Sequence, residues 1–140
     1  MKQYGMTILR VVVGAVFVTQ AYLALFAANP RGVAAFLAKI GLPAPTLLAV
    51  FLIVVHGFGG GMLIVGLWPR VAAAFNAGVL LVGFLAVYVR EGTILKGGLV
   101  DHVIGRAAGP GYEYVGLLLA ATVALASGGG GGGASAGRSK

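Results

Sequence analysis

Four long apolar segments, separated by short polar or proline-containing breaks, make up most of the chain. They run over approximately 7–28, 45–67, 69–89 and 112–127. A helix needs ~20 mostly apolar residues to cross a hydrocarbon core about 30 Å thick. The first three segments reach this length at ~1.5 Å per residue, whereas the fourth spans only ~24 Å and needs flanking residues or a thinned bilayer. The pattern therefore predicts four membrane-spanning helices.

Each segment is bounded by a proline-containing break. These breaks are Asn29-Pro30, Pro43-Ala44-Pro45, Trp68-Pro69 and Gly109-Pro110-Gly111. The residue before a proline avoids the helical region, and a proline in the first turn of a helix costs no hydrogen bond. Because Trp68-Pro69 leaves almost no connection, the second and third helices must form a tight antiparallel hairpin.

The two longer connections, 30–44 and 90–111, are expected on the same side of the membrane. In the first, apolar residues recur at helical spacing between Arg31 and Lys39, which indicates a short helix lying in the interface; a plain loop is the alternative. The second is the most polar part of the chain. The predicted fold is all-α, an integral membrane antiparallel four-helix bundle over 1–127 with this interfacial helix between its first two helices. A flexible glycine-rich tail follows over 128–140.

Composition supports a membrane protein. Hydrophobic residues make up 59% of the 140 residues, charged residues only 9%, and the mean hydropathy is +1.01. A soluble domain carries roughly 25% charged residues, so ordinary soluble enzymes and nucleic-acid binders are excluded. The chain has no cysteine, which removes disulfides, thiolate metal sites and cysteine nucleophiles.

The net charge of +7 comes from ten basic and three acidic residues, and it points to lipid headgroups rather than nucleic acid. The basic residues divide evenly between the two sides of the predicted bundle. One side holds Lys2, Arg10, Arg70, Arg138 and Lys140, and the other holds Arg31, Lys39, Arg90, Lys96 and Arg106. We expect both termini to be cytoplasmic. The first segment also has the outline of a signal peptide, but its apolar stretch is too long for one.

His56 is the strongest candidate for chemistry, because polar groups inside lipid are costly and it falls near the middle of the second segment. It could hydrogen-bond to a neighbouring helix, contact a quinone, relay a proton or ligate haem or a pigment. A bis-histidine haem within this chain is disfavoured, since the other histidine, His102, lies in a loop. We expect His56 to face the bundle or a partner rather than lipid.

Other candidates surround His56 or lie near the membrane surfaces. Gly60 belongs to a glycine-rich run that favours close helix packing, or offers a flat surface to a ring or an isoprenoid tail. Arg10 lies about one turn inside the first span, where its side chain can reach the headgroups. His102, next to Asp101, is a possible proton donor at a quinone head, and Glu113 could pair with an arginine. We expect no metal site and identify no catalytic residue, because no enzyme motif is present.

The order of these features resembles the DoxX family of small four-helix membrane proteins. The resemblance rests on an opening helix with Arg10, Gly14 and Phe17, an entry Gly41-Leu42-Pro43, the run from His56 to Gly66, the following Arg70, and the pair Tyr112-Glu113. Two departures are His56, where the family usually has glutamate, and Gln20-Ala21-Tyr22, where it usually has glycine and lysine. The usual serine–aspartate tail is replaced by glycines.

The resemblance implies membrane redox work in a prokaryotic cytoplasmic membrane. The leading interpretation is an accessory subunit of a membrane redox complex that anchors other subunits and contributes to a quinone site, with His56, Gly60, Arg10, His102 and Glu113 as its cofactor-binding candidates. A purely structural subunit of a respiratory or photosynthetic assembly and a stand-alone small-molecule transporter are the alternatives. The lipid bilayer and partner subunits are the expected partners, and nucleic acid is not.

Overall fold

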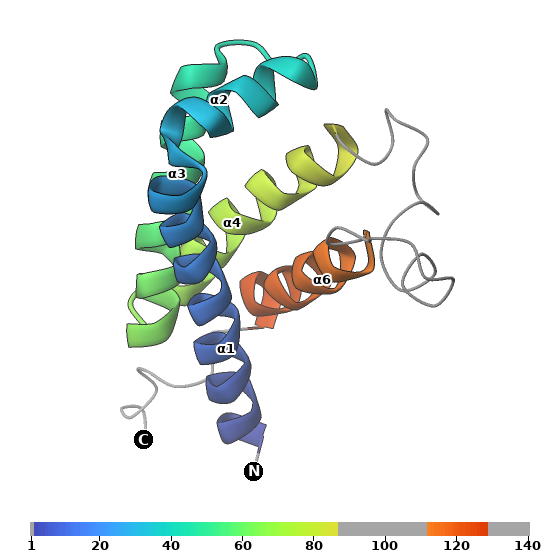
Figure 1. Ribbon diagram of the computed structural model, residues 1–140. Helices are drawn as coiled ribbons and strands as arrows, with labels where there is room; N and C mark the ends of the chain where they lie inside the picture. Colours follow the sequence, from blue (N-terminus) through green and yellow to red (C-terminus); the bar gives the residue numbers. More distant parts are fainter. Residues whose placement is uncertain (1, 87–111, 129–140) are drawn as a thin grey trace, which may run out of the picture.

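The structure is a computed structural model that describes residues 2–86 and 112–128, with side chains for 4–86 and 114–128. Every element in these ranges is helical. The elements are α1 (Lys2–Tyr22), the π-helical turn η1 (Leu23–Ala27), α2 (Asn29–Lys39), α3 (Pro45–Val65), α4 (Pro69–Phe84) and α6 (Tyr112–Gly128) (Figure 1). The all-α class is confirmed, and the connection after the first long helix contains a short helix rather than a plain loop.

The prolines begin helices where the sequence predicts. Pro30, Pro45 and Pro69 each stand in the first turn of a helix. The residue before each proline has a positive φ, at 51° for Asn29, 47° for Ala44 and 44° for Trp68, so the chain turns sharply into α2, α3 and α4. The side-chain oxygen of Asn29 also accepts a hydrogen bond from the backbone nitrogen of Gly32 at 3.0 Å, which caps the first turn of α2.

The four long helices contact one another in a ring. α1 packs along α3, α3 against α4, α4 along α6, and α6 against α1, while α2 lies across one end of α3. Figure 1 shows α4 and α6 side by side, and both are inclined to the pair formed by α1 and α3. The free end of α1 and the last residue of α6 lie at the same end, because Gly128 approaches the side chain of Met6.

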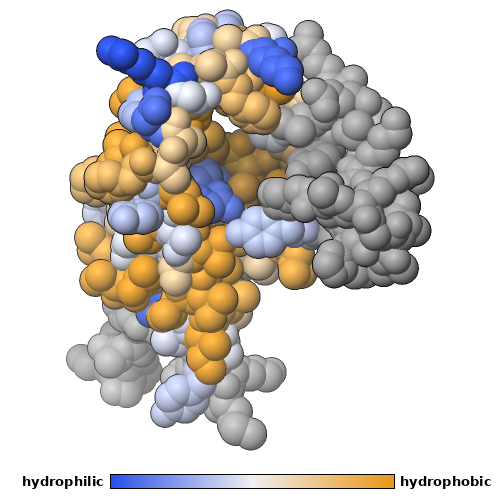
Figure 2. Space-filling view, viewed as in Figure 1, coloured by the Kyte–Doolittle hydropathy of each residue, from blue (hydrophilic) through white to orange (hydrophobic). Residues whose placement is uncertain are grey.

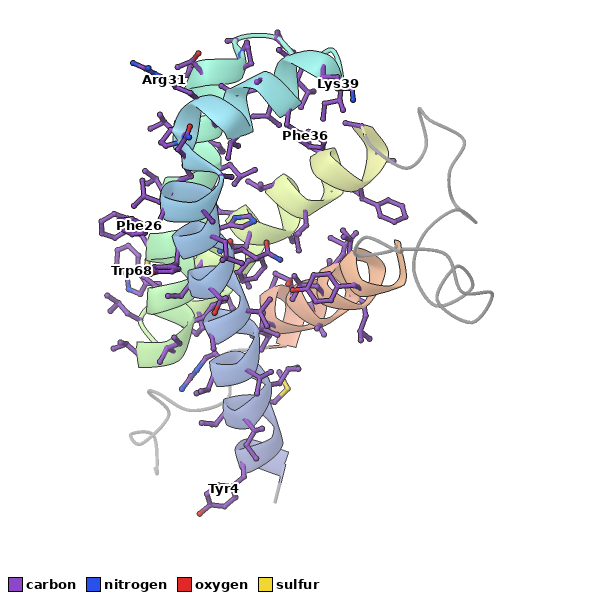
Figure 3. The ribbon with its side chains drawn as sticks, viewed as in Figure 1. Tyr4, Phe26, Arg31, Phe36, Lys39 and Trp68 are labelled. Carbon is purple, nitrogen blue, oxygen red and sulfur yellow. The ribbon has the colours of Figure 1, made fainter. Side chains whose placement is uncertain are left out.

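Two apolar clusters hold these helices. The larger joins all four long helices, and its buried members are Val13, Phe17, Leu63, Ala72, Ala73, Leu80, Leu118 and Leu125. The smaller fixes α2 to the start of α3 through Ala34, Leu37, Ile40 and Ala49. α2 is therefore a packed element of the fold, with its charged residues Arg31 and Lys39 directed outward in Figure 3.

The outer surface is strongly apolar. Large side chains such as Phe58, Val65 and Leu117 are about three-quarters exposed or more, at 75%, 80% and 74%. Figure 2 shows this apolar surface along the sides of the helices, with hydrophilic side chains gathered at the end formed by α2. Figure 3 shows Phe26 and Trp68 directed away from the helices. A water-soluble monomer rarely exposes so extensive an apolar surface.

Two helical stretches are long and apolar enough to cross a membrane, Tyr4–Ala27 and Pro45–Val65. α4 and α6 are shorter, with 16 and 17 residues. The helix in the first segment begins earlier than predicted, at Lys2, because the polar start of the chain continues the same helix. α4 ends at Phe84, and the predicted end of the third segment near residue 89 lies outside the described residues.

Candidate functional site

Among the described residues, three polar side chains are buried between the long helices: His56, Asn76 and Thr122. The hydroxyl of Thr122 in α6 donates to the backbone oxygen of Leu118 at 2.6 Å, whereas the other two are only partly satisfied. His56 in α3 is 3% exposed, and Asn76 in α4 is fully buried. His56 shares its face of α3 with the buried Gly60 and Leu63, at the spacing that places residues on one side of a helix. His56 therefore faces the other helices, as its position in the span predicts.

The imidazole of His56 packs against the aromatic ring of Phe17 in α1. The two ring centroids lie 4.9 Å apart and the planes meet at 68°, an edge-to-face arrangement. Such a contact contributes roughly 0.5–1.5 kcal/mol beyond the area that it buries. Because Phe17 is itself fully buried, α1 limits how the imidazole can turn.

The side chain of Asn76 lies where α4 crosses α3. Its Nδ2 donates a hydrogen bond to the backbone oxygen of Ala72 at 2.8 Å. The same nitrogen lies so close to Gly59 that a Cβ on that glycine would overlap it. Gly59 is three residues after His56 on the same helix, so the two polar side chains are about one helical turn apart along α3.

Each of these side chains has a buried polar atom that lacks a hydrogen bond to any described residue. The atoms are Nδ1 of His56 and Oδ1 of Asn76. A buried group left without a partner costs roughly 1–3 kcal/mol. A neutral imidazole can present Nδ1 as a donor or an acceptor, whereas the amide oxygen can only accept. Both atoms therefore keep hydrogen-bonding capacity that no described residue uses.

Gly60 is covered by α1. A Cβ on Gly60 would lie 2.8 Å from the backbone oxygen of Gly14, and a Cβ on Gly14 would lie 2.7 Å from the backbone oxygen of Gly60. This face of the glycine run thus serves helix packing. A Cβ on Gly61, by contrast, would meet nothing within 4 Å, so open space adjoins another face of the same run.

Arg10 lies away from His56. Its guanidinium packs against Gly66, where three of its atoms would each be 3.0 Å from a Cβ. Gly66 follows the last residue of α3 with a φ of 84°, so the positive charge lies at the negative end of the α3 dipole. Gly66 is ten residues beyond His56, about 15 Å along the helix, so the structure does not bring Arg10 and His56 together.

The remaining predicted candidates are not placed. His102 lies outside the described residues, in the gap from 87 to 111. Glu113 stands in the first turn of α6, but its side chain is outside the description. Both stay predictions. Among the side chains of 4–86 and 114–128, no group of three histidine, aspartate or glutamate residues could hold a metal ion.

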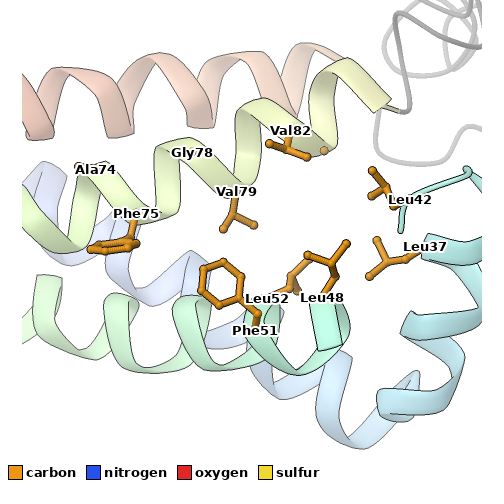
Figure 4. A pocket seen from close by; sticks show the side chains of 11 residues that line it. Leu37, Leu42, Leu48, Phe51, Leu52, Ala74, Phe75, Gly78, Val79 and Val82 are labelled. Atoms are coloured by element: carbon orange, nitrogen blue, oxygen red, sulfur yellow. The ribbon is translucent and has the colours of Figure 1, made fainter. Parts of the chain in front are cut away.

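An apolar groove between α3 and α4, closed at one end by α2, is a feature that the sequence pattern did not predict. It has a volume of about 490 Å³ (Figure 4). Its lining residues are Leu37, Leu42, Leu48, Phe51, Leu52, Ala74, Phe75, Gly78, Val79, Val82 and Gly83. Its place follows from the inclination of α4 to α3, which amphipathic spacing does not encode.

Two further polar residues gain a role in the structure. The Nε2 of Gln20 donates a hydrogen bond to the hydroxyl of Tyr114 at 3.1 Å and links α1 to α6. Asn76 is a fully buried polar residue that sequence reasoning did not place in the site. Its only signal in the sequence is an amide within an apolar helix.

Comparison with known proteins gives one match. A family model described as DoxX matches residues 5–89, which run from the first turn of α1 past the end of α4 and include His56, Asn76, Gly60 and Arg10. No curated protein and no solved structure matches the chain. The match covers more than half of the 140 residues and agrees with the exposed apolar surface. The chain belongs to the DoxX family of membrane proteins.

Proposed function

We propose that this protein is an integral membrane accessory subunit of a membrane redox complex, in which it anchors partner subunits and contributes to a quinone site. The observation that carries the proposal is the buried pair of His56 and Asn76, each with a polar atom that no described residue satisfies. These two side chains have unused capacity to hydrogen-bond a neutral polar group, and neither is a nucleophile. This favours a subunit that helps to form a binding site over a self-contained enzyme.

The membrane arrangement that goes with this function has four spanning helices. α1 with η1, and α3, have the length to cross the hydrocarbon core. α4 and α6, at about 24–26 Å, would cross a thinned region or be completed by flanking residues. α2 would lie in the interface, and both termini would face the cytoplasm of a prokaryotic cell.

Single cysteines test this topology, because the chain has none of its own. Ala35→Cys lies in α2, and Arg70→Cys lies at the start of α4, at the other end of α3. A membrane-impermeant thiol reagent applied to intact cells should label the first and leave the second until the membrane is opened. Labelling of both positions from the same face would overturn the arrangement.

Purification in a mild detergent distinguishes the three functional interpretations. Redox proteins that co-purify with the chain and lose quinone-linked turnover when it is deleted would support the accessory subunit. Attachment to a respiratory or photosynthetic core, without any effect on quinone-linked turnover, would favour the structural subunit. A single species without partners that carries substrate flux in vesicles would favour the transporter. The last two outcomes would each overturn the proposal.

A further inference from the structure

Within the described residues, the guanidinium of Arg10 has no carboxylate partner. Its Nε is buried and has no hydrogen bond to any described residue. The three acidic residues of the chain all lie outside the described side chains. One of them, Glu113, stands in the first turn of α6, whose last residue, Gly128, approaches Met6 at the end where Arg10 lies. Glu113 is thus about 22 Å away along α6 and out of reach of Arg10.

The turn after α3 holds this guanidinium in a defined orientation. Cζ, Nη1 and Nη2 of Arg10 each lie 3.0 Å from the position that a Cβ on Gly66 would take, so the planar group lies flat on this glycine. Its N–H bonds point within that plane, and they are therefore directed along the surface of the turn rather than into it. The dipole of α3 supplies only about half a negative charge here, so about half of the positive charge stays uncompensated.

Arg70 brings a second positive charge to the same turn. It stands in the first turn of α4, four residues after Gly66, and its side chain is exposed. Four residues of chain span at most about 14 Å, and the αL conformations of Gly66 and Trp68 shorten this distance because they reverse the chain. Arg10 and Arg70 therefore belong to one basic patch at the turn between α3 and α4.

This turn lies at the boundary of the hydrocarbon core. α3 has 21 residues without a charge, which is about the length needed to cross the core, and it ends at Val65, just before the turn. Val65, Leu67 and Trp68 are all exposed, and Figure 3 shows Trp68 directed away from the helices. An exposed apolar surface thus adjoins the basic patch, and together they fit a ligand with an anionic head and an apolar chain.

We propose that Arg10 and Arg70 bind the phosphate of an anionic phospholipid at the turn between α3 and α4, with its acyl chains beside Val65 and Leu67. A guanidinium can donate two parallel hydrogen bonds to a phosphate, and the orientation of Arg10 on Gly66 leaves such a fork accessible. No described carboxylate is present to bind the ammonium of a zwitterionic headgroup, so the patch selects a headgroup with a net negative charge. The inference does not depend on the proposed quinone site.

Trp68 supplies a reporter within the site, because it is the single tryptophan of the chain. The full chain is placed in phosphatidylcholine nanodiscs that contain a small fraction of lipid brominated near the start of its acyl chains. Bromine quenches tryptophan fluorescence on contact. Brominated phosphatidylglycerol should quench Trp68 as a lipid that binds at least about fivefold more tightly than brominated phosphatidylcholine, as expected for an anionic headgroup beside an arginine at the membrane surface.

Matched variants separate a defined site from a general attraction between charges. Arg10→Gln should abolish the preference for phosphatidylglycerol, and Arg70→Gln should lower it. Arg10→Lys keeps the charge but cannot form the fork, so the preference should still fall at least about threefold. Lys2→Gln removes the same charge from the start of α1, away from the turn, and should have the smallest effect. Circular dichroism establishes that the variants remain folded.

Three results would overturn the inference. Equal quenching by the two lipids would leave the basic patch to an acidic segment of a partner subunit. A loss in Lys2→Gln as large as in Arg10→Gln would replace the site by a diffuse positive field. Removal of the preference by inorganic phosphate would assign the patch to free phosphate rather than to a lipid. Each can occur while redox proteins still co-purify with the chain, so failure here is distinct from failure of the proposed function.

Discussion

The two sides of α3 differ in how closely the chain approaches them. Toward α1, backbone meets backbone at Gly14 and Gly60, and no Cβ fits at either position. Toward α4, the amide side chain of Asn76 packs against Gly59, and α3 and α4 also enclose a groove. The first contact fixes two helices to each other, and the second leaves a groove beside it. One helix thus has a close backbone contact on one side and a looser side-chain contact on the other.

The largest expected effect comes from adding a side chain to the face of α3 that packs against α1. Gly60→Ala would place a Cβ 2.8 Å from the backbone oxygen of Gly14 and 2.9 Å from the backbone nitrogen of Val18. Because backbone atoms cannot rotate away, the helices must separate, and the free energy of unfolding should fall by about 3 kcal/mol. Unfolding by SDS titration measures this loss. Gly61→Ala, whose Cβ meets open space, is the control, and an equal loss there would contradict the difference between the two faces.

The next effect concerns the polar pair. His56→Leu fills a similar volume but removes the ring nitrogens, so quinone-linked turnover or assembly of the complex should fall by about tenfold, which corresponds to 1.4 kcal/mol. His102→Ala should have a smaller effect. Both variants must be compared at equal amounts in the membrane. Normal assembly and turnover in His56→Leu would remove His56 from the site, and loss of a visible haem spectrum would instead make it a haem ligand.

The face of α3 that contacts α4 should tolerate an added methyl group better than the face that contacts α1. Gly59→Ala pushes a Cβ into the amide of Asn76, and this side chain can move, so we expect a loss of only about 1 kcal/mol. Asn76→Ala should rescue part of that loss, with a coupling of at least about 0.5 kcal/mol in a double-mutant cycle followed by SDS titration. Strict additivity of the two substitutions would show that this crossing is not formed by the amide.

The smallest expected effect concerns a third contact, between α1 and α6. It gives a reference value for the losses of stability on the two faces of α3. Gln20→Leu removes the hydrogen bond between Nε2 of Gln20 and the hydroxyl of Tyr114, which is partly exposed. Hydrogen bonds between membrane helices contribute about 0.6 kcal/mol on average, so the free energy of unfolding should change by this amount. Tyr114→Phe should give the same change in the same titration. A loss as large as that of Gly60→Ala would show that α6 holds α1 more firmly than packing indicates.

Much of the element order could be predicted from the sequence, because apolar runs and prolines act locally. Pro45 and Pro69 begin α3 and α4 where the pattern places them. The π-helical turn after α1 left no such signal, and the predicted first helix passes through it. Burial of His56 followed from the cost of a polar group in lipid. The approach of Asn76 to Gly59 depends on the angle at which two helices cross, and a single sequence carries no information about that angle.

The sharp turn between α3 and α4 has a consequence for how the protein enters the membrane. α3 has 21 residues without a charge, whereas α4 has only 16, with Arg70 in its first turn and Asn76 at its centre. α4 is therefore a poor insertion signal on its own. The αL conformations of Gly66 and Trp68 reverse the chain between the two helices within a few residues. We expect the translocon to receive α3 and α4 as one hairpin, in which the strongly apolar helix carries the weaker one, with its amide, into the bilayer.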